Sequence, residues 1–352
     1  MIKLPVSELQ PGMRLSMDVR LMDGRLLLLA GFAIKPLYIR KLDAFGIQHV
    51  YVEEGPYELI EEYTEEKLYE QAHTTIRKVF ALVRDNKEVD YSVIRKTVNE
   101  IIQMIISNET VMMHITGVRD IDNYTFLHCV DVCIYSVILG KKLGYSDEQL
   151  ISLGIGAILH DIGKCKISLD ILQKPDKLTD NEFSAMQLHT VYGCEIIKNA
   201  NGSLGNNIAN IAFQHHEKWD GSGYPLGIKA EMIDPFSRIV TVADIYDALT
   251  ADRVYKKKVL PHVAAEYIKN NASKLFDPFI VDLFISSIAV YTEGTIVLLN
   301  TGEVGSIIET KETSSSRQKI KVIANKSGPP VLEPYTKDLA RHPEVEIVEI
   351  FI

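Results

Sequence analysis

The sequence predicts a mainly α-helical protein, in which a helical bundle is flanked by small β-rich N-terminal and C-terminal modules. Between residues 57 and 291, apolar residues recur at helical spacing. On either side of this region, short apolar runs are bounded by turn-forming residues, which is typical of strands. The chain has 352 residues, of which 46% are hydrophobic, so it is long enough for one large core and smaller modules.

Residues 1–56 are predicted to form the N-terminal module. Asp23 and Gly24 separate two apolar runs, and this pair is a strong signal for a β-hairpin. Residues 34–45 are predicted to form a short helix, because a proline stands near its start and Gly46 follows its end. Residues 49–52 are predicted to form a closing strand.

The rest of the chain divides into three predicted parts. Residues 57–117 are expected to form packing helices, over 60–83 and 93–106, since Gly and Pro are nearly absent. Residues 118–291 are predicted to be a bundle of helices, separated at Gly144, at residues 202–203 and at residues 234–235. Residues 292–352 are predicted to return to strands, at 295–299, 304–308, 320–324 and 345–350.

Composition excludes several classes of protein. The net charge of −9 argues against a protein that binds a nucleic-acid polymer, which needs a basic face. No apolar run approaches the ~18 residues that span a bilayer, and no signal peptide is evident, so no membrane association is expected. The four cysteines fall in apolar helical patterns without a CxxC pair, which fits a cytoplasmic protein with small core residues.

The most informative pair is His160 and Asp161, which directly follows the apolar run of residues 153–159. An imidazole and a carboxylate at a buried helix end can bind one divalent metal, and the second carboxylate oxygen can then bridge to another metal. Such a pair is more often a surface or capping pair, so its interpretation depends on what accompanies it.

Further nitrogen and oxygen ligands lie on other predicted helices, which must converge for a metal site to form. They are His128, His189, His215, His216 and Asp244. Asp244 stands inside an apolar run, where a charge is costly unless it is paired or bound to a metal. The alternative is that Asp244 is a cap or an ion-pair partner and that each histidine is a hydrogen-bonded core residue. The mixed ligand set suits iron, manganese or zinc.

Residues 215–225 read HHEKWDGSGYP and resemble the HHExxDGxGYP signature of the HD-GYP family, whose HD pair is similar to His160 and Asp161. The resemblance covers roughly residues 120 to 290, so that 118–291 would be the HD-GYP catalytic domain. It implies an all-helical phosphodiesterase that hydrolyses cyclic di-GMP to pGpG and often on to GMP. It also implies two divalent metal ions as cofactors, iron or manganese.

The resemblance assigns the metal ligands by position. His128, His160, Asp161 and Asp244 would hold one metal, Asp161 would bridge, and the second metal would be held by His189, His215 and His216. A hydroxide held between two metals is a strong nucleophile at neutral pH, and the cations neutralise phosphate charge. Tyr124 stands where some members have a glutamate for a third metal, which favours a dinuclear site.

The resemblance also implies contacts with substrate. Lys164, one turn after Asp161, would be a catalytic residue that stabilises charge on the phosphate; otherwise it is a solvent-exposed lysine. Arg253 and Lys256 would contact phosphate or guanine, although Val254 replaces the usual proline. Tyr224 could stack on a base or hydrogen-bond to it, or its loop could only position the two histidines. Two further positions, which the resemblance places near the substrate and the metals, could equally be helix caps: Asp122 and Asp247.

Three functions therefore remain open from the sequence. The chain is expected to be a cyclic di-GMP phosphodiesterase with a metal-bridging hydroxide. Alternatively, it is a module that senses cyclic di-GMP or binds a protein with little turnover, or it hydrolyses another cyclic dinucleotide. The resemblance also implies a homodimer through the packing helices, and contacts between the GYP loop and diguanylate cyclase domains.

Overall fold

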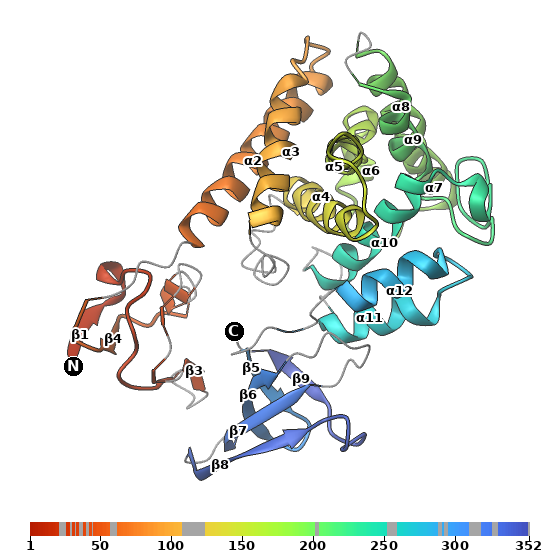
Figure 1. The fold of residues 1–352 in the computed structure, drawn as a ribbon. Coiled ribbons are helices and arrows are strands. Elements are labelled where there is room, and N and C mark those ends of the chain that lie inside the picture. The colour runs from red at the N-terminus through yellow and green to blue at the C-terminus, as the bar shows by residue number, and fades with distance from the viewer. Residues whose placement is uncertain are drawn as a thin grey trace. The chain divides into compact units, whose positions relative to one another are not determined.

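The computed structural model describes residues 1–20, 26–28, 30–31, 33–34, 38–39, 42–43, 45–56, 62–107, 124–200, 204–251, 259–287, 291, 295–309, 318–325 and 330–350. They form two compact units, one of Met1–Lys67 with Ala289–Ile352 and one of Leu68–Ile288. The second unit is helical and the first carries the strands, which confirms the predicted fold class (Figure 1). The boundaries of the four predicted parts remain a prediction.

The N-terminal part of the first unit is built from two short antiparallel strand pairs. β1 (Ile2–Pro5) pairs with β4 (His49–Val52), and β2 (Val19–Arg20) pairs with β3 (Leu26–Leu28). The predicted hairpin and closing strand are therefore present, although the Asp23–Gly24 turn lies outside the described residues. Of the predicted helix at 34–45, the described residues 38–39 and 42–43 are helical.

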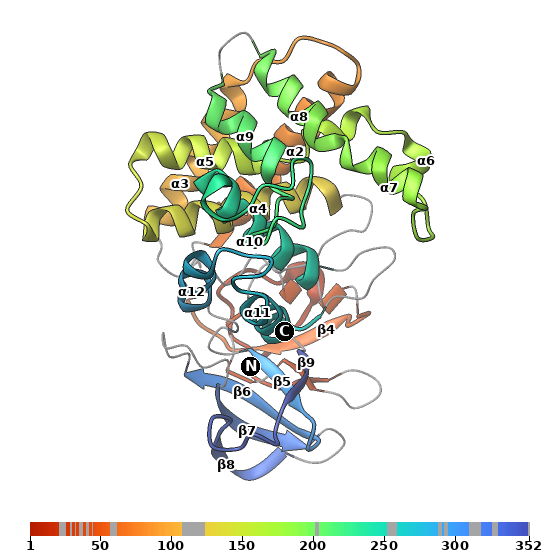
Figure 2. The ribbon, with the colours of Figure 1, turned by 90° about the vertical axis from the view of Figure 1, so that its right-hand side faces the viewer.

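The C-terminal part is an antiparallel five-stranded sheet with the order β8-β7-β6-β5-β9 (Figure 2). Its strands are β5 (Ile296–Leu299), β6 (Glu303–Glu309), β7 (Lys319–Asn325), β8 (Pro330–Asp338) and β9 (Ile347–Ile350). The sequence did not predict β8, because Pro330 and Pro334 argue against a strand. β8 lies at an edge of the sheet, where proline is tolerated because one side of the strand needs no ladder hydrogen bond.

The second unit is organised around three buried helices: α4 (Tyr124–Lys142), α5 (Asp147–Leu159) and α10 (Pro235–Thr250). Residues 128–140 of α4 are all buried, which explains why this stretch is apolar on every side. α4 packs against both α5 and α10. The two packing helices are α2 (Glu62–Arg84) and α3 (Ser92–Ser107), close to the predicted ranges.

Shorter helices complete the unit, and capping residues mark the starts of several helices. They are η4 (Ile162–Lys166), α6 (Leu169–Leu172), α7 (Asp180–Gln187), α8 (His189–Lys198), α9 (Asn206–Gln214), α11 (Pro261–Asn270) and α12 (Pro278–Ser287). Ser146 with Gln149, and Thr179 with Glu182, form capping boxes that start α5 and α7. Asp234 caps α10 and is followed by a proline at its first position.

Among the helices that the structure describes, none combines the length and the apolar character that a bilayer crossing requires.

Candidate metal centre

His160 and Asp161 lie where α5 ends, and both side chains are about 1% exposed. The turn that follows packs directly on the backbone of α8. A Cβ atom on Gly163 would lie 1.9 Å from the carbonyl oxygen of His189, so only glycine fits this position. The local sequence thus brings the HD pair against the start of α8, where His189 is the first residue.

His128 comes from α4 and Asp244 from α10, and these two helices pack against each other in the core. His128 Nε2 lies 3.2 Å from Oδ1 of Asp244, and His128 Nδ1 lies 2.6 Å from Oδ2 of Asp247. Asp244 and Asp247 are one turn apart on α10, so both face the same side of the helix. Asp244 is therefore buried and lies beside His128, an arrangement that fits a metal ligand and an ion-pair partner alike.

His215 and His216 follow the last turn of α9, and His215 Nε2 lies 3.4 Å from His189 Nε2 and 3.9 Å from Oδ1 of Asp161. The ring of His216 contacts His215 at 4.1 Å between centroids and Tyr224 at 4.8 Å. The loop that carries Tyr224 is tightly folded, since a Cβ atom on Gly223 would lie 2.5 Å from the carbonyl oxygen of His216. The loop therefore holds the two histidines, which is one of the two roles considered for Tyr224.

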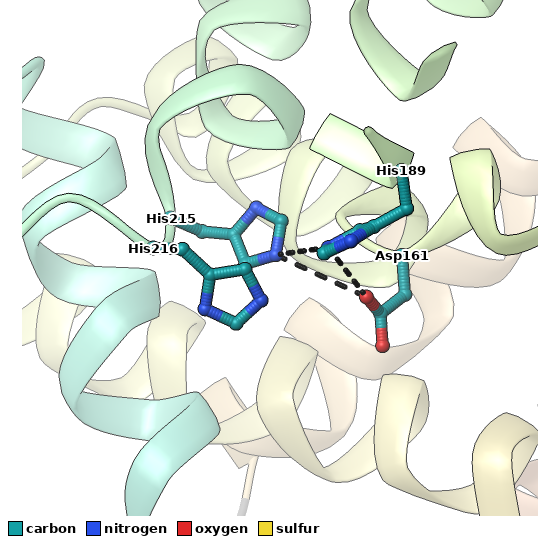
Figure 3. Close-up of side chains that lie close together, drawn as sticks. All are labelled: Asp161, His189, His215 and His216. Atoms are coloured by element: carbon teal, nitrogen blue, oxygen red, sulfur yellow. Dashed lines mark hydrogen bonds and ion pairs between the residues drawn. The ribbon is translucent and has the colours of Figure 1, made fainter. Parts of the chain in front are cut away.

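The seven predicted ligands gather in two clusters. In the His189 cluster, one ligand atom from each of Asp161, His189, His215 and His216 lies within 4.8 Å of the others (Figure 3). In the His128 cluster, the same holds for His128, His160 and Asp244. Each cluster has the nitrogen and oxygen donors that suit a divalent transition metal.

Asp161 connects the clusters through its two carboxylate oxygens. Oδ1 lies 3.5 Å from His189 Nε2 and 3.9 Å from His215 Nε2. Oδ2 lies 3.3 Å from His160 Nε2. One carboxylate that faces two ligand groups with different oxygens is the arrangement that a bridging ligand needs.

Backbone carbonyl groups fix the orientation of three of the histidines. The Nδ1 atoms of His160 and His189 lie 2.7 Å from the carbonyl oxygens of Ala157 and Met186. His215 Nδ1 lies 3.0 Å from the carbonyl oxygen of Ala212. Because a carbonyl can only accept, each Nδ1 carries the proton and each Nε2 keeps its lone pair for a metal.

Burial sets the charge of the His189 cluster. Burial lowers the pKa of His189, of His215 and of His216, the last to about 3, so the three rings are neutral at pH 7. Burial opposes the ionisation of Asp161, but Lys164 and His160 outweigh it and hold the pKa of this carboxyl well below its ordinary value. Neutral imidazoles around an ionised carboxylate are the protonation states that metal binding requires.

His128 differs from the other histidines. Burial alone would lower the pKa of its ring, but Asp244 and Asp247 outweigh it and raise this pKa to about 9. A metal at this position would replace the proton on Nε2 and bring the positive charge that the two carboxylates attract.

Unpaired polar atoms provide a test of whether a metal fits. His160 Nε2 and Asp161 Oδ1 are buried, and neither has a hydrogen-bond partner among the residues that the structure describes. His189 Nε2 and His215 Nε2 lie 3.4 Å apart, and both are lone-pair acceptors because their Nδ1 atoms carry the protons. Facing acceptors and an unsatisfied carboxylate oxygen are unfavourable unless a cation lies among them. The residues therefore fit a metal pair.

The predicted substrate contacts are only partly within the described residues. Lys164 Nζ lies 2.5 Å from Oδ2 of Asp161, at the edge of the centre. Asp247 is fully buried against His128, which favours a role in orienting this ligand over direct contact with substrate. Three predicted residues lie outside the described part of the chain: Asp122, Arg253 and Lys256.

Glu217 belongs to the HHEKWDGSGYP motif and is a further functional candidate, to which no role was assigned from the sequence. Its side chain is 1% exposed, and its Oε1 accepts a hydrogen bond of 2.7 Å from the backbone N–H of Leu226. The carboxylate thus closes the loop between His216 and Leu226. The sequence signal for this role of Glu217 is a glutamate beside a glycine-rich loop. The backbone N–H groups of such a loop need acceptors, and a carboxylate can supply them.

Comparison with known proteins places this centre in context. A family model described as HD domain matches residues 101–280. A cyclic di-GMP phosphodiesterase of Pseudomonas aeruginosa is 30% identical over 276 residues, which cover 78% of this chain and 66% of that protein. A 3'3'-cGAMP-specific phosphodiesterase of Vibrio cholerae is 39% identical over 155 residues, which cover 44% of this chain and 33% of that protein.

The alignments thus span just under two thirds of the first relative and one third of the second. Among solved structures, an HDG"Y"P protein from Bdellovibrio bacteriovorus superposes with a TM-score of 0.52 and 19% identity. The match covers 80% of this chain and 97% of that chain. At this identity the likeness shows a shared fold.

Proposed function

Because the chain belongs to the HD domain family, as its resemblance to HD-GYP proteins indicated, we propose that it is a metal-dependent phosphodiesterase that hydrolyses cyclic di-GMP. The observation that carries the proposal is the pair of ligand clusters that share Asp161. A module that only senses a nucleotide has no need of seven converging ligands, so the geometry favours an enzyme over the sensing alternative.

The metals proposed are two divalent ions, iron or manganese. The His128 cluster would hold one, the His189 cluster would hold the other, and Asp161 would contact both. When bound, such a pair supplies a nucleophile derived from water at neutral pH and neutralises the charge of the phosphodiester.

The residues of the chain have distinct tasks in this proposal. The Nδ1 bonds to the carbonyls of Ala157 and Met186 keep Nε2 of His160 and His189 aimed at the metals. Six of the seven ligands in the two clusters are buried, which limits the access of water to the centre. Lys164, whose side chain is 30% exposed beside the 2%-exposed Asp161, holds its ammonium where it can donate a hydrogen bond to a phosphate oxygen.

The tight turn at Gly163 and the loop from His216 to Leu226 keep these groups in place before substrate arrives. Positions that are fixed in advance lower the barrier because the donors need no reorganisation during the reaction. The ring contact between Tyr224 and His216 leaves the tyrosine beside the site, so a guanine base is a reasonable neighbour for it.

One comparison supports 3'3'-cGAMP as a second candidate substrate. The Vibrio cholerae relative named as specific for 3'3'-cGAMP is 39% identical in its aligned region, so close relatives of this domain differ in the cyclic dinucleotide that their names give. The shared chemistry is attack on a 3',5'-phosphodiester of a cyclic dinucleotide. The proposed product from cyclic di-GMP is linear pGpG, with GMP as the product of a second cleavage.

A single assay tests the proposal. The purified full chain is loaded anaerobically with Fe²⁺ or Mn²⁺, incubated separately with cyclic di-GMP and with 3'3'-cGAMP, and the products are resolved by chromatography. We expect metal-dependent formation of pGpG, with slower cleavage of 3'3'-cGAMP. Faster cleavage of 3'3'-cGAMP would overturn the substrate assignment, and tight binding of either nucleotide without cleavage would overturn the enzymatic function.

A further inference from the structure

The histidines of the two clusters differ in the groups that contact their Nδ1 atoms, on the side of the ring away from the metal position. His128 has a carboxylate on each side of its ring, Asp244 at 3.2 Å from Nε2 and Asp247 at 2.6 Å from Nδ1. The Nδ1 atoms of His160, His189 and His215 face neutral backbone carbonyls instead. A carboxylate behind a ligand histidine makes the ring a stronger donor than a carbonyl does.

The clusters also differ in charge. The His128 cluster has its own carboxylate, Asp244, and shares Asp161 with the other cluster. The His189 cluster consists of Asp161 and three neutral histidines. If Asp161 is counted in both clusters, a divalent ion would meet two carboxylates in the His128 cluster, those of Asp161 and Asp244. It would meet one in the His189 cluster, that of Asp161. Asp247 adds a third negative group close to the His128 cluster, and Coulomb attraction is strong at a buried site.

The His189 cluster is more open to solvent and less firmly held. Of its four ligands, His216 is partly exposed while the other three are buried. Among the described residues, no hydrogen bond to a ring nitrogen of His216 is found, and ring contacts with His215 and Tyr224 orient it. A ligand without a polar partner behind it fixes a metal less tightly.

We propose that Asp247 is a positioning residue for His128, and that it makes the His128 cluster the tighter of two unequal metal sites. The chain then fills the His128 cluster first and keeps the His189 cluster as the exchangeable site. Activity would follow the supply of the second metal while the first remains bound. This inference rests on the proposed metal centre and does not depend on which nucleotide is cleaved.

The geometry of Asp247 supports this role without reference to substrate. The side chain is fully buried, and it lies one helical turn after Asp244, so α10 presents both carboxylates to one ring. The bond to Nδ1 leaves Nε2 facing Asp244 and the metal position. Removing such a partner typically costs about 10- to 100-fold in metal affinity.

The test measures metal binding by the full-length apo protein, prepared with a chelator and titrated anaerobically with Mn²⁺ alone. Free Mn²⁺ is followed by its electron paramagnetic resonance signal. Asp247→Asn removes the charge with little change of shape, and His189→Ala removes a ligand from the second cluster. Asp277→Asn is the matched control. Asp277 is also a buried carboxylate, and its Oδ2 accepts a hydrogen bond of 2.8 Å from the guanidinium of Arg238 on α10, but it belongs to neither cluster.

For the wild type we expect two binding steps, with dissociation constants that differ by about tenfold or more. His189→Ala should keep the tight step and lose the weak one. Asp247→Asn should weaken the tight step by about 10- to 100-fold, and Asp277→Asn should leave both steps unchanged. Thermal unfolding of each apo variant checks that the fold is retained.

The proposal is overturned if His189→Ala abolishes the tight step, if Asp247→Asn leaves both dissociation constants unchanged, or if Asp277→Asn weakens the tight step as much as Asp247→Asn does. Because no nucleotide is present, failure here is distinguishable from failure of the phosphodiesterase proposal. Two equal sites could still support cleavage, and two unequal sites could exist in a protein that does not cleave cyclic di-GMP.

Discussion

Lys164 Nζ lies 2.5 Å from Oδ2 of Asp161, the carboxylate that connects the two ligand clusters. The lysine side chain is 30% exposed and the aspartate side chain is 2% exposed, so the ammonium is the outer partner of a buried ligand. A cation in this place can move from the carboxylate to an incoming phosphate without belonging to either cluster. It can therefore contribute to catalysis separately from metal binding.

Lys164→Ala should lower kcat by about 10² to 10³, because one donor to the developing charge on the phosphate is removed. The bound metal should stay close to the wild-type amount, since Lys164 is not among the clustered ligands. Steady-state kinetics and elemental analysis on the same preparation check both statements. Wild-type turnover at saturating substrate would mean that Lys164 has no catalytic role.

Asp161→Ala should abolish turnover and reduce bound metal from about two per chain, the number expected for a two-metal site, to well below one. The reason is that its two oxygens face different clusters. His73→Ala is the control, because His73 lies on α2 against Phe126 and in neither cluster. Equal loss of metal in both variants would show that the centre is misplaced, and a wild-type content near three would contradict a dinuclear site.

Gly163→Ala should destabilise the protein by roughly 1 to 3 kcal/mol and lower its metal content. The added Cβ atom would lie 1.9 Å from the His189 carbonyl oxygen and 2.5 Å from the Gly193 nitrogen, both in backbone that cannot give way easily. Gly205→Ala is the matched control, because a Cβ atom there meets nothing within 4 Å. Thermal unfolding and metal analysis compare the two, and similar unfolding temperatures would contradict the packing argument.

The apo protein should lose stability as pH falls from 7 to 5. Burial depresses the pKa of His216 to about 3, below the ordinary value of 6.5, so in this window the unfolded chain takes up a proton that the folded chain does not. His216 alone contributes a loss on the order of 1 to 2 kcal/mol. Above pH 6.5 this loss is absent, because the ring is neutral in both states.

Urea unfolding at pH 7 and pH 5, in the presence of a chelator, measures this effect. His216→Ala should make the free energy of unfolding less dependent on pH, because the group that takes up a proton only in the unfolded chain is removed. An unchanged pH dependence in His216→Ala would contradict a buried, neutral ring. His128 acts in the opposite direction, since its raised pKa adds stability that is lost as pH rises towards 9.

Local patterns were sufficient for most of the secondary structure, because helical and strand periodicities and capping residues act over a few residues. The end of α4 at Lys142, just before Gly144, and the pairing of β2 with β3 follow from such patterns. β8 was missed because its prolines disfavour a strand in general, and only the sheet order reveals that it lies at an edge. A propensity is a property of a segment, whereas an edge is a property of the whole sheet.

The sequence by itself determined the fold class and the chemical identity of the seven candidate ligands, since residue types and the HHEKWDGSGYP motif are written in the chain. The tertiary structure decided how these ligands are grouped, that Asp161 faces both groups, and that Asp247 lies behind His128. These contacts join residues up to 119 positions apart. Distances of that kind are set by the packing of α4, α5, α8, α9 and α10 around one core, and no local pattern encodes them.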